Sequence, residues 1–382
     1  MPEINIKEMG LYIHLPYCVH RCIYCDFNVT VLSREEELSW YLKVLQKEIL
    51  FYAQTYPDKI IDTLFLGGGT PSLFSEQHIS DLISFICKHF KTASSLEISL
   101  EANPCSATLV KLKGFKEGGV TRVSFGIQTF HPKHLKTLQR SHSQEEALLA
   151  YQLAREAGFD NINLDLIFGI PHQSVQEFQE DVRRAISLGP EHLSTYHLSV
   201  PQNNPLYPIL PLEEVSADMY EWVMDFLPSQ GYGHYEVSAF AKPSFQCAHN
   251  LKYWKLQDYL GLGVGASSYV TTPQMPWGHH FKNTGSLHVY GEKVQVEGSA
   301  KGQEEILTKE QAQKEYLLTQ LRLTEGVSFE AYEERFGVSL MKSYGSVVDK
   351  LLTWGLLDSS EKVLKLNHRG SLTLNKVLVE FM

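Results

Sequence analysis

The stretch Tyr12-Ile-His-Leu-Pro-Tyr-Cys-Val-His-Arg-Cys-Ile-Tyr-Cys-Asp-Phe27 contains three closely spaced cysteines, Cys18, Cys22 and Cys25, in a C-x3-C-x2-C pattern. Three thiols cannot all pair as disulfides, and a closed structural zinc site needs a fourth ligand. A [4Fe–4S] cluster held by three thiolates leaves one iron atom open, where chemistry can take place. The spacing therefore favours an iron–sulfur cluster at this loop.

A zinc site is the alternative for these cysteines, and it stays open at this point. His14, His20 or a side chain distant in the sequence could complete four-coordinate zinc. The remaining cysteines, Cys87, Cys105 and Cys247, are scattered along the chain. We expect Cys87 to pack on the apolar face of a helix, as buried cysteines commonly do.

Length, composition and charge bound the class of protein. A chain of 382 residues exceeds one compact core of usual size, so two domains are expected. The formal net charge is −10 and no long basic block is present, which argues against a nucleic-acid substrate. The sequence shows no secretion signal and no apolar run long enough to be a transmembrane segment. We expect a cytoplasmic protein, in a compartment where thiols stay reduced.

From residue 10 to about 227 the sequence alternates short β-rich runs with segments of helical period. The expected strands are Leu11–Leu15, Thr63–Leu66, Leu96–Leu100, Val123–Ile127, Asn163–Phe168 and Leu193–Leu198. Six such units predict an α/β fold in which a parallel sheet, with its helices outside, curls into a barrel or a part of one. A flat doubly wound sheet is the competing fold, and the pattern alone does not separate the two.

Local signals mark several helix ends. Ser-x-x-Glu capping boxes are expected at Ser33/Glu36, Ser143/Glu146 and Ser174/Glu177. Gly118 and Gly158 lie where helices are expected to end.

Unusual residues fall at the ends of the expected strands. The second strand ends in Gly67-Gly-Gly-Thr-Pro71, which indicates either a ligand close to bare backbone or an ordinary turn. The third strand runs into Glu101, the fourth into Gln128, and the fifth carries Asp165. A buried carboxylate needs a partner, and Arg140 could be that partner or could bind the carboxylate of a ligand. Because barrel enzymes place their chemistry at this edge, we expect a site there.

The cysteine spacing, with Tyr24 directly before the third cysteine, resembles the signature of the radical S-adenosylmethionine (SAM) enzymes. In that family the open iron binds the methionine end of SAM, and one electron from the cluster breaks a carbon–sulfur bond to give a 5′-deoxyadenosyl radical. The other strand-end residues resemble the SAM site of the oxygen-independent coproporphyrinogen dehydrogenase group in order and approximate spacing. The residues that carry this resemblance are Tyr12, Tyr24, Gly68, Gly69, Thr70, Glu101, Gln128, Arg140 and Asp165.

The resemblance implies the partial (β/α)6 form of the barrel, and it implies roles for these residues. Cys18, Cys22 and Cys25 would hold the [4Fe–4S] cluster, and the Gly68–Thr70 run would meet the methionine part of SAM. Glu101, Gln128, Arg140 and Asp165 would contact the amino-acid or nucleoside portions. An electron donor such as flavodoxin or ferredoxin could be a partner of such a cluster.

Two features indicate one branch of this group. The dehydrogenase proper has a further cysteine two positions after the third cluster ligand, where this chain has Phe27. The His249-Asn-Leu-Lys-Tyr-Trp254 run, followed by the Gly261-Leu-Gly-Val-Gly265 run, resembles the haem-chaperone branch. His249 is the candidate haem ligand, and a hydrogen-bonded turn residue is the alternative interpretation of it. The resemblance implies a haem chaperone that delivers haem to apo-proteins, with coproporphyrinogen dehydrogenase as the alternative function.

After about residue 300 the sequence no longer alternates short strands with helices. Expected helices at Thr308–Leu323, Ser328–Phe336 and Ser346–Trp354, with a ribbon at Val363–Leu366, suggest a winged-helix-like domain. Acidic residues in this part argue against DNA binding. They favour a domain that contacts another protein or forms a lid over the substrate. We therefore divide the chain into a radical SAM core at 1–238, a connecting segment at 239–300 and a C-terminal domain at 301–382.

Overall fold

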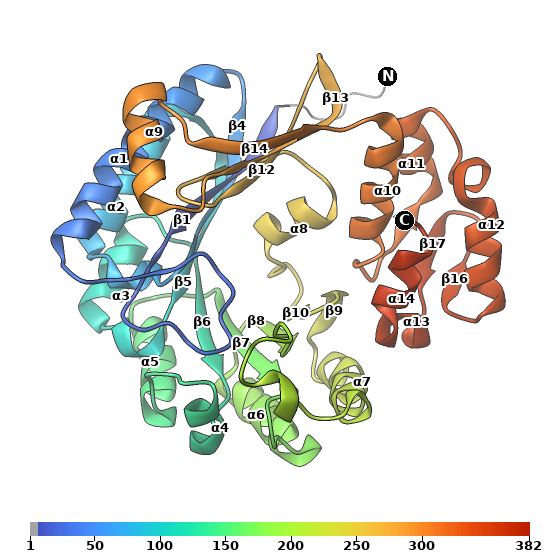
Figure 1. Ribbon diagram of the computed structural model, residues 1–382. Helices are drawn as coiled ribbons and strands as arrows, with labels where there is room; N and C mark the ends of the chain where they lie inside the picture. Colours follow the sequence, from blue (N-terminus) through green and yellow to red (C-terminus); the bar gives the residue numbers. More distant parts are fainter. Residues whose placement is uncertain (1–6) are drawn as a thin grey trace.

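The computed structural model describes residues 7–382, which form one large curved sheet, an outer layer of helices and a C-terminal domain (Figure 1). The central strands of the sheet run parallel to one another; six of them are the strands that the sequence predicts, and the seventh, at Tyr259–Leu262, was not expected. In spatial order they are β11 (Tyr259–Leu262), β1 (Glu8–Leu15), β4 (Ile60–Gly68), β5 (Lys91–Ala102), β6 (Arg122–Gln128), β7 (Ile162–Phe168) and β8 (His192–His197). All six expected strands are present, with ends that differ by a few residues from the expected ones.

Antiparallel strands extend both ends of this parallel region. They are β12 (Ser267–Thr272), β13 (Met275–Asn283) and β14 (Lys301–Ile306) beyond β11, and β10 (Ala239–Ala241) and β9 (Gly233–Glu236) beyond β8. The sheet order begins with β14 and ends with β9, so the sheet curls without closing. The residues expected to be a connecting segment, 239–300, therefore include strands of the main sheet, while the domain boundaries themselves stay a prediction.

The outer helices cover the convex face of the sheet (Figure 1). They are α1 (Glu36–Thr55), α2 (Glu76–His89), α3 (Leu109–Glu117), α4 (Pro132–Thr137), α5 (Gln144–Glu156), α6 (Val175–Leu188), α7 (Glu213–Ser229) and α9 (Leu287–Glu297). This one-sided covering distinguishes the partial barrel from a doubly wound sheet, which carries helices on both faces. The concave face instead meets the short helix α8 (Ala248–Trp254).

The structure tests the expected helix ends. The capping boxes at Ser143/Glu146 and Ser174/Glu177 form at the starts of α5 and α6. The box expected at Ser33 is wrong, because Glu35 occupies the N-cap of α1 in helical conformation and makes no side-chain cap bond. Gly118 caps α3, and Gly158 follows α5 with a φ of 87°. Cys87 is exposed on α2 rather than packed on its apolar face, which Ile79, Leu82, Ile83 and Ile86 occupy.

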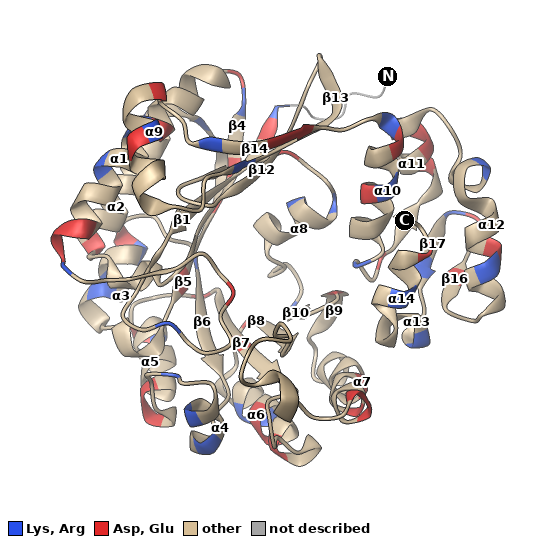
Figure 2. Cartoon of the chain, in the orientation of Figure 1, with Lys and Arg blue, Asp and Glu red and all other residues tan. Residues whose placement is uncertain are grey.

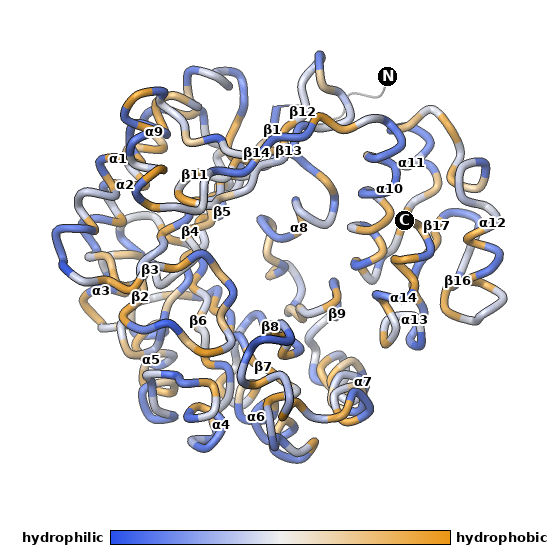
Figure 3. The backbone as a smooth tube through the Cα atoms, viewed as in Figure 1, coloured by the Kyte–Doolittle hydropathy of each residue, from blue (hydrophilic) through white to orange (hydrophobic). Residues whose placement is uncertain are grey.

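Hydrophobic and charged residues separate between the inside and the outside of the fold. Hydrophobic and hydrophilic residues alternate along the outer helices (Figure 3), as expected for helices that bury one face. The main core lies between these helices and the sheet, and includes Leu11, Ile13, Leu64, Leu100 and Leu164, each 0% exposed. Acidic and basic residues are interspersed along α6, α9 and α12 (Leu340–Thr353) (Figure 2). No helix in residues 7–382 combines the length and apolar character of a bilayer span.

The C-terminal domain has its own core and a small antiparallel sheet, as the winged-helix-like prediction requires. Its elements are α10 (Lys309–Gln320), β15 (Val327–Ser328), α11 (Phe329–Phe336), α12, β16 (Leu357–Ser359), β17 (Val363–Leu366), α13 (His368–Leu372) and α14 (Leu374–Val379). The core of this domain includes Leu256 and Tyr269, which belong to the region of the main sheet. The two parts of the chain are therefore packed together.

A buried carboxylate ties α1 to the end of the main sheet. Glu48 on α1 is 0% exposed and accepts hydrogen bonds from the Gly263 amide (2.8 Å), the Asn283 side chain (2.7 Å) and the Tyr290 hydroxyl (2.7 Å). Burial raises the pKa of Glu48 from 4.5 to about 7, although these three donors lower it. The folded protein thus holds this proton more tightly than the unfolded chain.

We predict that Glu48→Gln removes a pH dependence of stability. Because the folded pKa of Glu48 lies above its unfolded value, its contribution to stability is greatest below pH 4.5 and falls by about 3 kcal/mol as the pH rises to about 7. As the pH is raised from 5 to 8, the native chain should lose this contribution and the variant should not. The thermal midpoint of the variant minus that of the native chain should therefore increase. Glu36→Gln, at an exposed position of the same helix, is the control. Parallel pH profiles for the native chain and the Glu48→Gln variant would contradict the prediction.

Candidate functional site

A cavity of about 330 Å³ opens at the carboxyl ends of the parallel strands. Its volume falls within the range of about 300–1,000 Å³ that is usual for small-molecule sites. Eleven of the thirteen predicted site residues line it: Cys18, Cys22, Tyr24, Cys25, Gly68, Gly69, Thr70, Glu101, Gln128, Arg140 and Asp165. The parallel register brings them together, because residues that follow neighbouring strands meet at one edge of the sheet.

The cysteines lie on a loop that is closed at its base. The short strands β2 (Tyr17–Cys18) and β3 (Thr30–Val31) pair with each other and hold the loop between them. The Cys25 amide donates to the Cys22 carbonyl at 3.1 Å, which forms a tight turn between the last two cysteines. The Thr70 hydroxyl donates to the Cys18 sulfur at 3.4 Å, and Arg140 Nη1 donates to the Cys22 sulfur at 3.6 Å. Two thiols thus contact residues that follow other strands.

The donor set suits an iron–sulfur cluster. Burial raises the pKa of the Cys18 and Cys25 thiols, so each loses a proton when it binds a metal. Residues 7–382 contain no three His, Cys, Asp or Glu side chains gathered closely enough for a single ion. A cluster does not need that convergence, because each thiolate binds a different iron atom. Of the two histidines considered for zinc, His14 has both ring nitrogens in contacts, with the Tyr12 hydroxyl (3.0 Å) and the Asn28 carbonyl (2.8 Å).

The glycine run packs against the chain that leads into the cysteine loop. The Gly69 amide donates to the Leu15 carbonyl at 2.9 Å, and the Thr70 amide donates to the Tyr17 carbonyl at 2.8 Å. A Cβ at Gly69 would lie 2.6 Å from the Pro16 carbonyl carbon, and Gly68 has a φ of 111°. The glycine run therefore approaches the backbone of the protein itself closely, and its approach to a ligand stays a prediction.

Two carboxylates lie on the wall of the cavity. Glu101 accepts a hydrogen bond from the Gly68 amide at 3.0 Å, and desolvation, followed by the nearby Asp165 charge, raises its pKa to about 7. Burial also raises the pKa of Asp165, which accepts from Ser124 (3.0 Å) and Asn163 (2.8 Å). Of the two roles considered for Arg140, the structure does not show partnership with Asp165, because the cation that acts on the Asp165 carboxylate is Arg122.

Arg140 faces the cysteine loop instead. Its Nη2 donates to the Gly126 carbonyl at 2.7 Å, and its Nε is buried without a partner among the described residues. A Cβ at Gly126 would lie 2.9 Å from Gln128 Nε2 and 3.4 Å from Arg140 Nη2, so this glycine lets both side chains lie close to the strand. The Arg140 guanidinium is therefore held beside the thiols, and its Nε–H remains available to donate a hydrogen bond.

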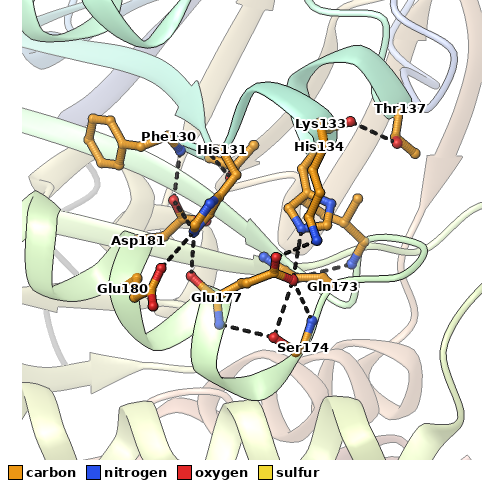
Figure 4. Close-up of polar contacts among 12 residues, drawn as sticks. Phe130, His131, Lys133, His134, Thr137, Gln173, Ser174, Glu177, Glu180 and Asp181 are labelled. Atoms are coloured by element: carbon orange, nitrogen blue, oxygen red, sulfur yellow. Dashed lines mark hydrogen bonds and ion pairs between the residues drawn. The ribbon is translucent and has the colours of Figure 1, made fainter.

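The segment that carries Gln128 and Arg140 is anchored to α6 by an acid that the sequence reasoning missed (Figure 4). The Asp181 carboxylate, 1% exposed, accepts from the Thr129 hydroxyl and from the Phe130 amide, both at 2.7 Å. Gln128, directly before them, has a φ of 68°, which is strained for a residue with a side chain. The signal in the sequence was an aspartate beside the apolar positions Phe178 and Val182 of a helix.

Further contacts join α4 itself, and His131 directly before it, to α6 (Figure 4). Glu177 pairs with Lys133, and its carboxylate lies 3.2 Å from His134 Nε2. The ring of His131 lies 3.1 Å from the Glu177 carbonyl. These contacts fix α4, which begins four residues after Gln128 and ends three residues before Arg140.

Two predicted residues, Tyr12 and His249, do not line the cavity. The Tyr12 hydroxyl contacts His14 Nδ1, and desolvation raises its pKa well above 10. His249 is 0% exposed, with Nδ1 2.9 Å from the Thr63 hydroxyl and Nε2 2.8 Å from the Tyr253 hydroxyl. In this structure neither ring nitrogen of His249 is free to bind iron, so its assignment to haem stays a prediction that requires these contacts to break.

Comparison with known proteins gives consistent matches along the chain. The family model of the radical SAM superfamily matches residues 12–185, and that of the HemN C-terminal domain matches residues 307–373. The heme chaperone HemW of Bacillus subtilis is 37% identical over 380 residues, covering 97% of this chain and 98% of the relative. The heme chaperone HemW of Haemophilus influenzae is 33% identical, covering 100% and 99%. The solved coproporphyrinogen III oxidase (HemN) of Escherichia coli matches with a TM-score of 0.87 at 24% identity, covering 100% of this chain and 91% of that one, which shows a shared fold.

We predict that Asp181→Ala weakens the binding of SAM while the iron content is retained. Two donors beside Gln128 would lose their buried acceptor, at a cost of about 1–3 kcal/mol each, and the segment that carries Gln128 and Arg140 would loosen. The dissociation constant for SAM, measured by anaerobic calorimetry on cluster-loaded protein, should rise about tenfold, which corresponds to about 1.4 kcal/mol. Gln176→Ala, at an exposed position of α6 that does not contact His131, should bind SAM as the native chain does. Unchanged affinity in the Asp181→Ala variant would refute this role.

Proposed function

The chain belongs to the HemW heme chaperone family within the radical SAM superfamily, and from that membership we propose that it binds haem and delivers it to apo-proteins. The observation that carries the proposal is the cavity in which the three thiols and the strand-end residues meet, within a chain that aligns with these relatives over nearly its whole length. The cytoplasm is the location we propose, because it keeps such thiols reduced.

We propose further that Cys18, Cys22 and Cys25 hold a [4Fe–4S] cluster and that the same cavity takes SAM. Such a cluster supplies a single electron and an open iron site that can bind an amino acid group. The chain supplies the binding surface: the Gly68–Thr70 run for the methionine part, and Glu101, Gln128, Arg140 and Asp165 for the remaining portions. Tyr24 adds an aromatic wall beside the third cysteine, and an electron donor such as flavodoxin or ferredoxin would be needed for reduction.

The residues on the cavity wall favour a charged ligand of this kind. The unpartnered Nε of Arg140 and its position beside Cys22 provide a cation for a carboxylate. Glu101, with a pKa of about 7, provides an acceptor whose charge a positive ligand would stabilise. A SAM molecule carries both a carboxylate and positively charged groups. Arg140 could therefore bind the carboxylate, and Glu101 could bind a positively charged group.

Phe27 favours a haem-carrying function and disfavours the dehydrogenase reaction. It lies on the cavity at 61% exposure, at the position where the resemblance to the dehydrogenase would require a fourth cysteine. The likeness to coproporphyrinogen III oxidase lies at 24% identity and bears on the fold alone. We therefore propose no oxidative decarboxylation for this chain.

We predict that serine at any of the three loop cysteines abolishes cluster assembly. After anaerobic reconstitution the native chain should hold about four iron atoms, and Cys18→Ser, Cys22→Ser and Cys25→Ser should each hold far fewer. Cys105→Ser is the matched control, because this fourth thiol also lines the cavity but lies outside the loop. If Cys105→Ser loses iron as severely as the others, or the native chain binds zinc in preference, the cluster assignment is wrong.

Haem delivery is tested by transfer to a haem-free acceptor. We predict that the cluster-loaded chain binds haemin and passes it to apo-myoglobin or an apo-cytochrome faster than free haemin equilibrates. The acceptor spectrum reports the transfer, and a parallel anaerobic incubation with coproporphyrinogen, SAM and a reductant should yield no vinyl-bearing product. Absence of haemin binding by the native chain would remove the chaperone function.

A further inference from the structure

Haem is a flat apolar ring with an iron centre and two carboxylates, so its site needs an iron ligand, apolar walls and a cation. His249 is enclosed, and most other described histidines are engaged in hydrogen bonds or ion pairs; examples are His192, with its nitrogens near Asn163 and Tyr235, and His280, paired with Glu315. The cavity described above is lined by two histidines, His20 and His197.

His197 is held in place by packing rather than by hydrogen bonds. It ends β8, its ring lies 5.3 Å from the ring of Phe168, and it covers Gly169. A Cβ at Gly169 would lie 2.9 Å from His197 Cδ2, and the φ of 75° at this glycine also favours a residue without a side chain. Among residues 7–382, no hydrogen bond to either ring nitrogen of His197 is present, although the residue is exposed.

The electrostatics of His197 suit an iron ligand. Desolvation lowers the pKa of its ring, while the charge of Glu213 opposes the shift, so the imidazole is neutral near pH 7. Since no hydrogen bond fixes the ring, a half-turn about its Cβ–Cγ bond exchanges the two edges. In the structure Cδ2 and Nε2 lie over Gly169, so Nδ1 lies on the opposite edge of the ring, and a half-turn would place Nε2 there instead.

The mouth of the cavity also has apolar walls. Val19 and Phe27 on the cysteine loop are 65% and 61% exposed, and Tyr196, beside His197, is 42% exposed. All of them line the same cavity, together with Arg21, whose guanidinium donates to the Cys25 carbonyl at 3.3 Å. Large apolar side chains that remain exposed around one opening mark a binding surface, and Arg21 offers a charge partner for a carboxylate.

Building on the proposed function, we propose that haem binds across the mouth of this cavity, with His197 as its iron ligand and with Val19, Phe27 and Tyr196 as its apolar walls. His20 is the weaker candidate, because it lies on the loop between cluster ligands and its ring has no packing contact of the kind that Phe168 and Gly169 give to His197. Cargo and cluster then share one opening, so that bound haem covers the cluster loop.

The test is a haemin titration of the cluster-loaded full-length chain, followed by the Soret band and by electron paramagnetic resonance. His197→Ala should weaken haemin binding at least tenfold and remove the spectrum of a histidine ligand. His249→Ala and His20→Ala should keep that spectrum. The iron content and thermal midpoint of each variant show whether the cluster and fold are intact, and His197→Gln, which retains a side chain of similar size, serves as a second variant if His197→Ala is unstable.

Each other outcome overturns the proposal. Loss of the histidine spectrum in His249→Ala alone would place haem at α8, and its loss in His20→Ala alone would place the ligand on the cysteine loop. Native-like binding in His197→Ala would exclude His197 as the ligand. These results all differ from a native chain that binds no haemin, which would instead refute the proposed function.

Discussion

The contact between the end of β4 and the chain entering the cysteine loop is the constraint on which the site depends. Register pairs Leu15 with Gly68, and the amides of Gly69 and Thr70 then donate to the backbone of the entering chain. A side chain at Gly69 would collide with Pro16, so the approach requires glycine. This contact sets the base of the cysteine loop and brings Cys18 to Thr70. Without it, the thiols would not face the residues that follow β5, β6 and β7.

The site is built from polar groups whose burial costs free energy. Glu101 and Asp165 have raised pKa values, and Arg140 keeps an unpartnered Nε among the described residues. Groups of this kind destabilise a fold unless a ligand satisfies them, so their concentration at one cavity is characteristic of a binding site. Asp181 offsets part of this cost on the outer side, because it satisfies the backbone and hydroxyl donors next to the strained Gln128.

The concave side of the sheet is filled by a helix that polar contacts hold. The Glu97 carboxylate accepts from the amides of Ala248 and His249 at the start of α8, and Lys252 pairs with Asp62 at 2.6 Å. His249 is thereby part of the packing between α8 and the sheet, with Thr63 and Tyr253 at its ring nitrogens. A histidine in a motif-like run can thus be committed to structure, while one without a motif, His197, remains accessible at the cavity.

The sequence alone determined the six strands between residues 10 and 198, their parallel direction and the residues at their carboxyl ends, because these depend on local pattern and on the edge geometry of parallel sheets. It also determined the three-thiol loop, whose ligands are seven residues apart at most. Only the tertiary structure decided which polar side chains are engaged in contacts within the protein and which remain available to a ligand. The strands within 239–300, including the parallel strand β11, the anchoring of the Gln128 segment by Asp181 and the enclosure of His249 all arise from contacts between distant segments. Hydrogen-bond partners at such separations leave no periodic signal in the sequence.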